Sequence, residues 1–354
     1  MSGIADDAPP LAGVRVLDLS SYTPGPLCAA ILADLGAEVL KVERPGGGDP
    51  GRTVTPGAYQ ALNRRKRVVE LDLKDSAGQA ELAGMADDAD VLVQAFRSGA
   101  ADRMGIGPAQ LTARNPRLVY CAINGFGSAS AAAAHDIDVA ARTGLLWMSG
   151  DGDREPRRTG AVPHADVAAA QYAVSAILAA LLRRERTGRG AVLEVPMTAA
   201  ALKLVEFRLA DHAAEGFPSR QEFLTRPAYG AFRAGDGARV ALACVSDTDW
   251  ANLVAVLPSP ALRDDGRLRT AAGRAEHAAA IRDGLDDAFA TRPAADWLTL
   301  LEAAGVPVAP VHSPAELAGD PVIAALGVLR SATGGSVEVA FPVSGLGVGA
   351  DAAR

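Results

Sequence analysis

Three side chains near the middle of the chain combine a proton-transfer group with carboxylates. His135 and Asp136 are adjacent, and Asp166 follows about thirty residues later, where a long alanine-rich apolar segment begins. An imidazole exchanges protons near neutral pH, whereas a carboxyl group needs burial or a helix terminus to match that task. Bases on both faces of a carbon next to a carbonyl can move its proton, and a carboxylate can also attack a carbonyl. The residues therefore predict acid–base or nucleophilic chemistry.

Simpler interpretations of the same residues stay open. Asp166 could be only the N-cap of the helix that follows, because aspartate is favoured there. His135 and Asp136 could be polar loop residues, and His164 could either orient Asp166 or do nothing. The remaining histidines stand in no metal-ligand spacing, so no metal site is predicted. The chain also lacks a G-x-S-x-G motif, which disfavours an ordinary serine hydrolase.

Composition narrows the class of protein. With 354 residues and a net charge of -7, the chain is large enough for one or two domains and poorly suited to tracking nucleic-acid phosphates. Its three cysteines are far apart and have no C-x-x-C spacing, which fits a reducing compartment. The first residues lack the pattern of a signal peptide, and no apolar run has the length and flanks of a membrane span. We expect a cytoplasmic protein with no nucleic-acid or membrane partner.

The elements that must position these residues alternate between strand and helix. A strand over 14–19, a helix over 27–35 and a strand over 38–42 form a βαβ unit. Further strands are predicted over 68–73, 91–94, 119–124 and 191–195, with helices over 77–86, 166–186 and 198–214. This pattern indicates an α/β fold with a doubly wound, Rossmann-like sheet that binds ligands at the carboxyl ends of its strands.

A smaller α/β domain is predicted within the larger one. A hairpin over 228–245, turning at 235–237, precedes helices over 247–256, 275–289 and 294–304. Strands over 306–311 and 337–340 follow. We therefore expect residues 1–200 to form the first part of a large domain, 201–225 a linker helix, 226–304 the small domain, and 305–354 the return to the large domain.

Two kinds of segment are candidates for holding an anion. The loop over 20–26 joins a strand to a helix and could present backbone N–H groups, although it could equally be a plain turn. Four successive cations at 64–67 form a basic run that could bind phosphate or be a solvated face. Arg97 and Arg103 follow the strand over 91–94, where a parallel sheet would place its ligand.

Motifs along nearly the whole chain resemble those of the family III CoA-transferases and α-methylacyl-CoA racemases. They are LAGVRVLDL at 11–19, PGP at 24–26, LADLGAEV at 32–39, KVERP at 41–45, RMGIG at 103–107, RTGRG at 186–190 and AGVPVAPV at 304–311. The resemblance implies a homodimer of interlocked rings, in which each subunit has a large Rossmann-like domain and a small domain. It also implies an acyl-CoA substrate held on the large domain, with no cofactor beyond the CoA moiety and no metal.

The resemblance extends to site residues. Arg44 matches a CoA-binding arginine of the family, and segments bordering the nucleotide contain Lys66, Arg67, Lys74, Arg97 and Arg103; Tyr22, in the first loop, is included among the CoA-binding candidates. The catalytic candidates are His135, Asp166 and Asp136. In transferases of the family the aspartate matching Asp166 attacks the thioester. In racemases it pairs with the histidine of a His-Asp-Ile-Asn-Tyr motif, which here reads HDIDV at 135–139.

Because the histidine is present, we predict an acyl-CoA racemase or epimerase acting at the α-carbon through an enolate. The alternative is a CoA-transferase with Asp166 as nucleophile and His135 in an auxiliary role. A catalytically degenerate CoA-binding protein is a third reading, because Ser246, with Asp247 beside it, stands where racemases commonly place a glutamate. The acyl group is left open. Both enzymatic readings require His135 and Asp166 to meet at one cleft.

Overall fold

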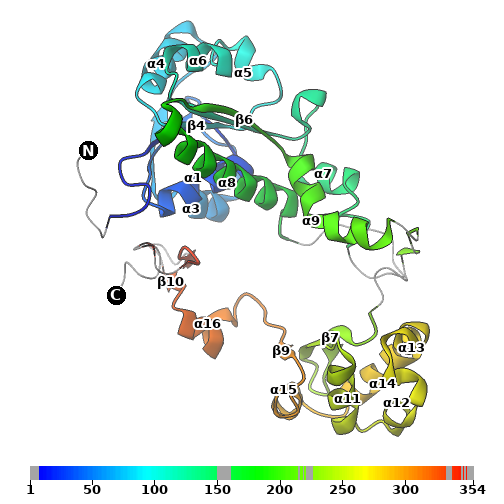
Figure 1. Cartoon of the computed structure of the whole chain (residues 1–354). Coiled ribbons are helices and arrows are strands. Elements are labelled where there is room, and N and C mark those ends of the chain that lie inside the picture. Colours follow the sequence, from blue (N-terminus) through cyan, green and yellow to red (C-terminus); the bar gives the residue numbers. More distant parts are fainter. Residues whose placement is uncertain are drawn as a thin grey trace. The chain divides into compact units, whose positions relative to one another are not determined.

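The computed structural model describes residues 8–149, 161–213, 216–217, 219–220, 226–331, 337–343, 346 and 348. The chain divides into two compact units, with the second unit beginning near residue 218 and the chain returning to the first near residue 322 (Figure 1). Each unit has its own buried core, so each is described by itself.

The first unit is built on a parallel sheet of six strands among the described residues. In spatial order these are β3 (Lys66–Glu70), β2 (Glu38–Glu43), β1 (Arg15–Asp18), β4 (Val91–Gln94), β5 (Val119–Asn124) and β6 (Ala191–Pro196). The strand order reverses between β1 and β4, which is the order of a doubly wound Rossmann-like sheet. The prediction of this sheet is confirmed, and its ligand crevice is expected at the carboxyl ends of β1 and β4.

Helices cover both faces of this sheet because its side chains alternate between two apolar layers. Val16 packs with α1 (Pro24–Asp34), α8 (His164–Thr187) and α9 (Met197–His212) on one face. Leu17 packs on the other face with α4 (Ser76–Asp87), α5 (Ala100–Arg103) and α6 (Pro108–Arg114) (Figure 1). These two apolar layers hold the helices on the two faces of the sheet, so the carboxyl ends of the strands lie along one edge.

Short elements complete the first unit. Two helices that the sequence analysis did not predict, α2 (Gly51–Val54) and α3 (Pro56–Asn63), join β2 to β3, and α7 (Asp136–Arg142) follows the short turn η1 (Gly127–Ala129). Near the end of the chain come α16 (Pro321–Leu326) and the antiparallel pair β10 (Leu329–Ser331) and β11 (Val337–Val339).

The long helix α8 is apolar enough, by length and composition, to cross a membrane. Half of its apolar stretch is buried inside the structure, where α8 packs against α1, α9, β5 and β6. It is therefore placed as a core helix of the first unit.

The second unit is a three-stranded antiparallel sheet backed by helices. The strands are β7 (Tyr229–Arg233), β8 (Arg239–Ala243) and β9 (Val308–Pro310); the helices are α11 (Asp247–Val256), α12 (Pro260–Asp264), α13 (Ala271–Glu276), α14 (Ala278–Phe289) and α15 (Ala294–Ala303), with turns η2 (Gly266–Arg269) and η3 (Leu317–Gly319). Within its core, Phe289 stacks on Phe232 and meets Trp297 at a tilt, with ring centroids 5.0 and 4.9 Å apart.

The boundaries of the second unit differ from the sequence prediction. Strand β9 pairs with β8, so residues that we assigned to the returning large domain complete the small sheet. The predicted helix over 275–289 is two helices that meet at His277. The predicted linker over 201–225 begins inside α9, which packs on α8, and residues 214–215, 218 and 221–225 of that segment lie outside the described residues.

Candidate active site

Asp166 lies in the first turn of α8, but it is not the N-cap that its position suggested. The helix begins at His164, and its N-cap residue is Pro163, which has no side-chain acceptor. Instead, Oδ1 of Asp136 accepts the backbone N–H groups of Ala165 and Asp166, at 2.7 and 3.3 Å. A carboxylate from the start of α7 thus satisfies free donors at the start of α8. The carboxylate of Asp166 is left free for another use.

The Thr23 hydroxyl is among the groups that act on the Asp166 carboxyl, and it lowers the pKa of that carboxyl. Thr23 is the N-cap residue of α1, yet its side chain does not cap that helix. A threonine at this position ordinarily bonds to the backbone of its own helix. Here it makes no such bond and acts on the Asp166 carboxyl, so the loop after β1 lies near the start of α8.

The surroundings of Asp166 favour its neutral form. Burial and, after it, the nearby Asp136 carboxylate together raise the pKa of this carboxyl to about 7, and the Thr23 hydroxyl acts against both. No cation contributes among the groups that act on it in the described part of the chain. A carboxyl that titrates near neutral pH without an ion-pair partner is a candidate for chemistry, because a structural carboxylate is usually paired.

His135 directly precedes Asp136, whose carboxylate accepts the N–H groups at the start of α8. It is the N-cap residue of α7, directly before Asp136, and its backbone N–H donates to Oδ2 of Asp138 at 2.9 Å. Its exposed ring meets the ring of Tyr22 edge to face, with centroids 6.2 Å apart. Tyr22 precedes Thr23, so segments 22–23, 135–136 and the start of α8 come together. No direct contact between His135 and Asp166 is among the contacts of the described residues, so their convergence on one cleft stays a prediction.

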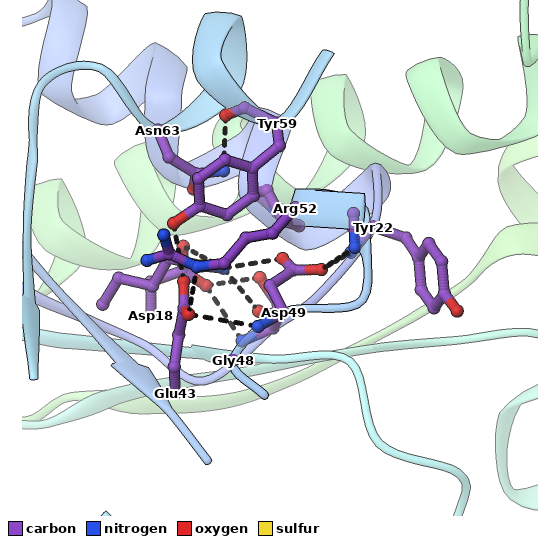
Figure 2. Close-up of polar contacts among 12 residues, drawn as sticks. Asp18, Tyr22, Glu43, Gly48, Asp49, Arg52, Tyr59 and Asn63 are labelled. Atoms are coloured by element: carbon purple, nitrogen blue, oxygen red, sulfur yellow. Dashed lines mark hydrogen bonds and ion pairs between the residues drawn. The ribbon is translucent and has the colours of Figure 1, made fainter. Parts of the chain in front are cut away.

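Tyr22 adopts an unusual backbone conformation. Its φ is +63°, and it is the one non-glycine residue with a positive φ among the described residues. Its backbone N–H donates to Oδ1 of Asp49 at 3.2 Å. Figure 2 shows this bond at the edge of a polar cluster, with the Tyr22 ring pointing away from Asp49. The two loop N–H groups of Ser20 and Tyr22 are thus bonded to Asp18 and Asp49, which leaves them unavailable to an external anion.

A cavity of about 290 Å³ opens at the carboxyl ends of the sheet strands. Its lining includes Ser20 and Ser21 after β1, Arg44 after β2, Lys74 after β3 and Phe96 after β4. This is where a doubly wound sheet binds ligands. Arg44 and Lys74 therefore lie where the sequence analysis expected CoA contacts. Arg97 and Arg103 are exposed beside Phe96 and Met104, which also line the cavity.

Two of the predicted CoA contacts lie elsewhere. The ammonium group of Lys66 is buried, with 1% of the side chain exposed, and it donates to Oδ2 of Asp18 at 2.8 Å and to the Pro26 carbonyl at 2.9 Å. It is committed to the interior and is not placed to bind a phosphate. Arg67 lines a separate cavity of about 540 Å³ with Arg15 and Arg65, toward the amino ends of the strands. The structure thus does not group it with Arg44 and Lys74.

The rest of the basic run also has structural partners. Arg64 and Arg65 both pair with Asp34, at 3.2 and 3.4 Å, and both pair with Glu338 near the end of the chain, at 3.0 and 3.6 Å. The run of cations therefore joins α1 and the C-terminal strand β11 to the sheet edge. It does not form an open phosphate-binding patch.

Ser246 and Asp247, in the second unit, have structural roles in the contacts of the described residues. The Ser246 hydroxyl accepts the backbone N–H of Asp249 at 3.0 Å and caps α11. Asp247 pairs with Arg274 at 2.7 Å. Neither contact resembles the role of a glutamate that reaches an active-site histidine.

No group of three or more metal-ligating side chains occurs in the ranges that the structure describes. His164 has a buried Nδ1 without a hydrogen-bond partner in those ranges, and no bond joins it to Asp166 there. The site is accordingly assembled from a carboxylate, a hydroxyl, an imidazole and a second carboxylate.

Comparison with known proteins identifies the family. Residues 11–353 match the model of CoA-transferase family III, and the chain belongs to this family. It is 34% identical to the acetyl-CoA:oxalate CoA-transferase of Acetobacter aceti, over 92% of this chain and 86% of that protein. It is 32% identical to the succinyl-CoA:glutarate CoA-transferase of Mus musculus, over 87% of this chain and 73% of that protein.

A solved structure is similar in fold over nearly its whole length. The crystal structure of Rv3272 from Mycobacterium tuberculosis superimposes with a TM-score of 0.84 at 30% identity, covering 97% of this chain and 95% of that one. That protein is named a probable fatty acyl-CoA transferase. The predicted family is thus confirmed, and the chain is an enzyme of the CoA-transferase kind. The relatives favour the transferase alternative over the racemase that we predicted first.

Proposed function

We propose that the protein moves CoA between carboxylic acids and that Asp166 carries the acyl group. The observation that supports this most is the environment of Asp166: a half-buried carboxyl whose pKa is raised to about 7 by burial and by the neighbouring Asp136 carboxylate. A carboxylate without an ion-pair partner keeps its lone pairs available for attack. The names of the relatives support the same reaction.

The reaction can be written as four balanced exchanges. An Asp166 oxygen attacks the thioester carbonyl, and the C–S bond breaks to give a mixed anhydride and CoA thiolate. The thiolate attacks the Asp166 carboxyl carbon, which releases the first acid as a carboxylate and leaves an Asp166–CoA thioester. The acceptor carboxylate attacks that thioester and releases the thiolate again. The thiolate finally attacks the acceptor acyl carbon, which forms the new acyl-CoA and restores the Asp166 carboxylate.

CoA is proposed to bind in the 290 Å³ cavity at the carboxyl ends of β1 to β4. Arg44 and Lys74 line this cavity and would pair with phosphate groups, and the exposed Arg97 and Arg103 would extend the positive surface. The loop over 20–23 borders both this cavity and Asp166, which supports placing the thioester beside that loop. No cofactor beyond the CoA moiety is proposed.

A coupled assay tests this function. Purified protein is given acetyl-CoA or succinyl-CoA with a panel of free acids that includes dicarboxylates, since two of the relatives are named for oxalate and glutarate. New acyl-CoA formed in equal amount to the consumed donor is the expected result. Thioester hydrolysis alone, or CoA binding without transfer to any acid in the panel, would contradict the proposal.

The racemase remains a second candidate because His135 lies beside Asp136 and near the same loop as Asp166. It predicts deuterium uptake from heavy water at the α-carbon of a 2-methylacyl-CoA, and loss of that uptake in His135→Ala and Asp166→Ala. Under the transferase proposal, His135→Ala keeps a large part of the transfer activity. The same two variants therefore separate the candidates.

The homodimer is also a proposal, as is the interlocked-ring arrangement. Supporting it, α9 exposes four large apolar side chains: Leu202, Leu204, Phe207 and Leu209, with 37 to 60% of each accessible. Exposed apolar clusters of this kind commonly mark protein contacts. Light scattering coupled to size exclusion should give twice the mass of the 354-residue chain, and a monomer at all concentrations would contradict it.

A further inference from the structure

The acids and cations that line the 290 Å³ cavity differ in how they are paired. The acids are Glu43, Asp49 and Asp72, and the cations are Arg44 and Lys74. Glu43 forms an ion pair with Arg52 at 2.8 Å. Asp49 forms one with the buried Lys41 at 3.1 Å. Neither lining cation has an ion pair among the contacts of the described residues. The unpaired charges on the wall are thus two cations and one acid, which favours an anionic ligand.

Glu43 stands where doubly wound proteins often bind a ribose. It is the last residue of β2, the strand beside β1. In dinucleotide-binding sheets, an acid about 20 residues after the first loop bonds to a ribose hydroxyl, and a nearby arginine accommodates a phosphorylated ribose instead. Glu43 follows the loop over 20–23 by this spacing, and Arg44 is the next residue. The cavity therefore has both kinds of side chain at the place expected for the ribose.

The carboxylate of Glu43 is committed to protein donors (Figure 2). Its Oε1 accepts the Tyr59 hydroxyl at 2.8 Å, and its Oε2 accepts Nε of Arg52 at 2.8 Å. Oε2 also accepts the backbone N–H of Asp49 at 3.1 Å. Burial raises the pKa of Glu43, but the bonds from Arg52 and Tyr59 outweigh burial and hold it below its usual value. Glu43 is thus ionised near neutral pH, and Arg52 balances its charge.

The loop that carries Arg44 passes directly against this ion pair. Nε of Arg44 donates to the Gly48 carbonyl at 3.2 Å, and the Gly48 N–H donates back to the Arg44 carbonyl at 3.1 Å. Gly48 has a φ of +60°, and a Cβ there would lie 2.3 Å from Oε2 of Glu43 and 2.9 Å from Nε of Arg52. The charge balance of the pair is therefore set within the same short loop that holds Arg44.

We propose that Arg52 is a specificity-determining residue. By pairing with Glu43 it cancels a negative charge at the ribose position, so the cavity accepts a phosphate on the ribose beside Arg44. The protein then selects CoA, whose ribose carries a phosphate, over dephospho-CoA, whose ribose does not. The inference rests on the proposed function, because that function supplies CoA as the ligand of this cavity.

The experiment measures the ratio of two dissociation constants by isothermal titration calorimetry of the full chain. The natural protein should bind CoA about tenfold or more tightly than dephospho-CoA, because charge-assisted bonds to phosphate are strong. Arg52→Gln keeps a hydrogen-bond donor but leaves the charge of Glu43 unbalanced. It should raise the Kd for CoA about tenfold and that for dephospho-CoA little, so the ratio falls toward one. Arg52→Lys keeps the charge and should keep the ratio.

Three further variants separate charge from structure. Arg52→Gln/Glu43→Gln removes both charges and should restore the ratio. Glu43→Gln alone leaves Arg52 unbalanced and should raise the ratio, which keeps the test decisive if Arg52→Gln fails to fold. Tyr59→Phe removes a donor from the same carboxylate without changing any charge, and it should leave the ratio near that of the natural protein.

Two results would overturn the inference. Equal weakening of both ligands by Arg52→Gln would mean that the loss acts on the shape of the cavity or on a group that both ligands share. A double variant Arg52→Gln/Glu43→Gln that binds CoA as weakly as Arg52→Gln would mean that the guanidinium itself binds the phosphate, with no part for Glu43.

The transfer assay distinguishes a failure of this inference from a failure of the proposed function. A natural protein that prefers CoA over dephospho-CoA but transfers no acyl group to any acid supports the inference and contradicts the function. A natural protein that transfers CoA yet binds both ligands equally contradicts the inference alone.

Discussion

Asp18 and Asp166 both lie in the first unit, near the carboxyl end of the sheet or the helix that follows it, yet their environments are opposite. Asp18 is fully buried beside the ammonium groups of Lys66 at 2.8 Å and Lys41 at 3.8 Å. Burial alone would raise its pKa, but the two lysines outweigh burial and lower it. Burial and the nearby Asp136 carboxylate raise the pKa of Asp166 to about 7, because no cation offsets them among the groups that act on it in the described residues.

The difference separates a carboxylate that holds the fold together from one that is kept ready for a reaction. A buried charge with excellent partners is fixed in one state, and its removal leaves its partners unpaired. A buried charge without a cation can change its state near neutral pH. The predictions below test whether the two carboxylates keep these separate roles.

The largest effect is expected from Asp166→Asn. The amide cannot form the acyl anhydride, so transfer should fall by about a thousandfold or more, as for the loss of other covalent nucleophiles. The fold should be retained, because Asp166 has no ion-pair partner to leave behind. Steady-state transfer rates and far-ultraviolet circular dichroism check the two halves of this prediction. Near-normal transfer by Asp166→Asn would show that Asp166 is not the reactive carboxylate.

Asp18→Ala should reverse this pattern and act on stability. Removing Asp18 leaves Lys41 and Lys66 as buried cations, and breaking a buried pair costs about 3–5 kcal/mol. Urea unfolding should show this loss in the free energy of unfolding. Asp87→Ala is the matched control, because its partner Arg114 is exposed and an exposed pair adds little to the free energy of unfolding. Equal stability of the two variants would refute the structural role of Asp18.

The pH dependence of the free energy of unfolding should also differ between the contributions of Asp166 and Asp18. Asp166 has a raised pKa in the folded state, so the folded protein holds its proton more tightly than the unfolded chain. Stability is then lost as pH rises from about 4 through about 7, by about 2 kcal/mol after allowance for partial exposure. Asp18 has a lowered pKa, so its contribution is lost only as pH falls below the unfolded value of 3.8. Comparing urea unfolding of the natural protein and Asp166→Asn at pH 5 and 8 checks this.

Binding should be separable from the chemistry of Asp166. Arg44→Ala and Lys74→Ala each remove a cation from the cavity wall, and each should raise KM for the acyl-CoA about tenfold. The acidic limb of the kcat/KM profile should not move, since neither residue acts on Asp166. Arg67→Ala, on the separate cavity, is the control and should change KM little. A larger effect from Arg67 than from Arg44 would place CoA elsewhere.

The smallest effect is expected from Asp136→Asn. The amide oxygen still accepts the N–H groups of Ala165 and Asp166, but the charge that raises the pKa of Asp166 is gone. The acidic limb of kcat/KM should therefore move to lower pH, with a gain of a few-fold at pH 6. An acidic limb of kcat/KM at unchanged pH would mean that Asp136 acts only as the cap of α8. A loss of activity at every pH would mean that its charge is needed in the reaction.

The sequence predicts the strands and helices that carry this site better than it predicts the contacts between its side chains. Strong strand–helix alternation predicts the doubly wound sheet, and the apolar run after Asp166 predicts α8. The capping of α8 by Asp136 could not be predicted, because α7 itself is a short helix in a segment read as a loop. The His135…Asp138 spacing, with an acid bonding to the N-cap N–H, is the local signal that could have found it.

The sequence also does not show which groups the charged residues pair with. Lys66 and Arg67 looked alike in a basic run, yet one is buried on Asp18 and the other lines a separate cavity. Their strand alternation sends them to opposite faces, and only the three-dimensional pairing shows which face holds an acid. The Thr23 hydroxyl was missed for the same reason, since a threonine before a helix predicts a cap. Strand β9 joined the small sheet through a long-range pairing that no local pattern shows.

The most direct test of the central claim is to locate the acyl group on the protein. The enzyme is mixed with acyl-CoA, quenched with hydroxylamine, digested and mapped by mass spectrometry, with Asp166→Asn treated in parallel. The account predicts a hydroxamate on Asp166, formed only when acyl-CoA is present and absent from the variant. A hydroxamate on Asp136 or another acid, or none at all while transfer proceeds, would contradict it.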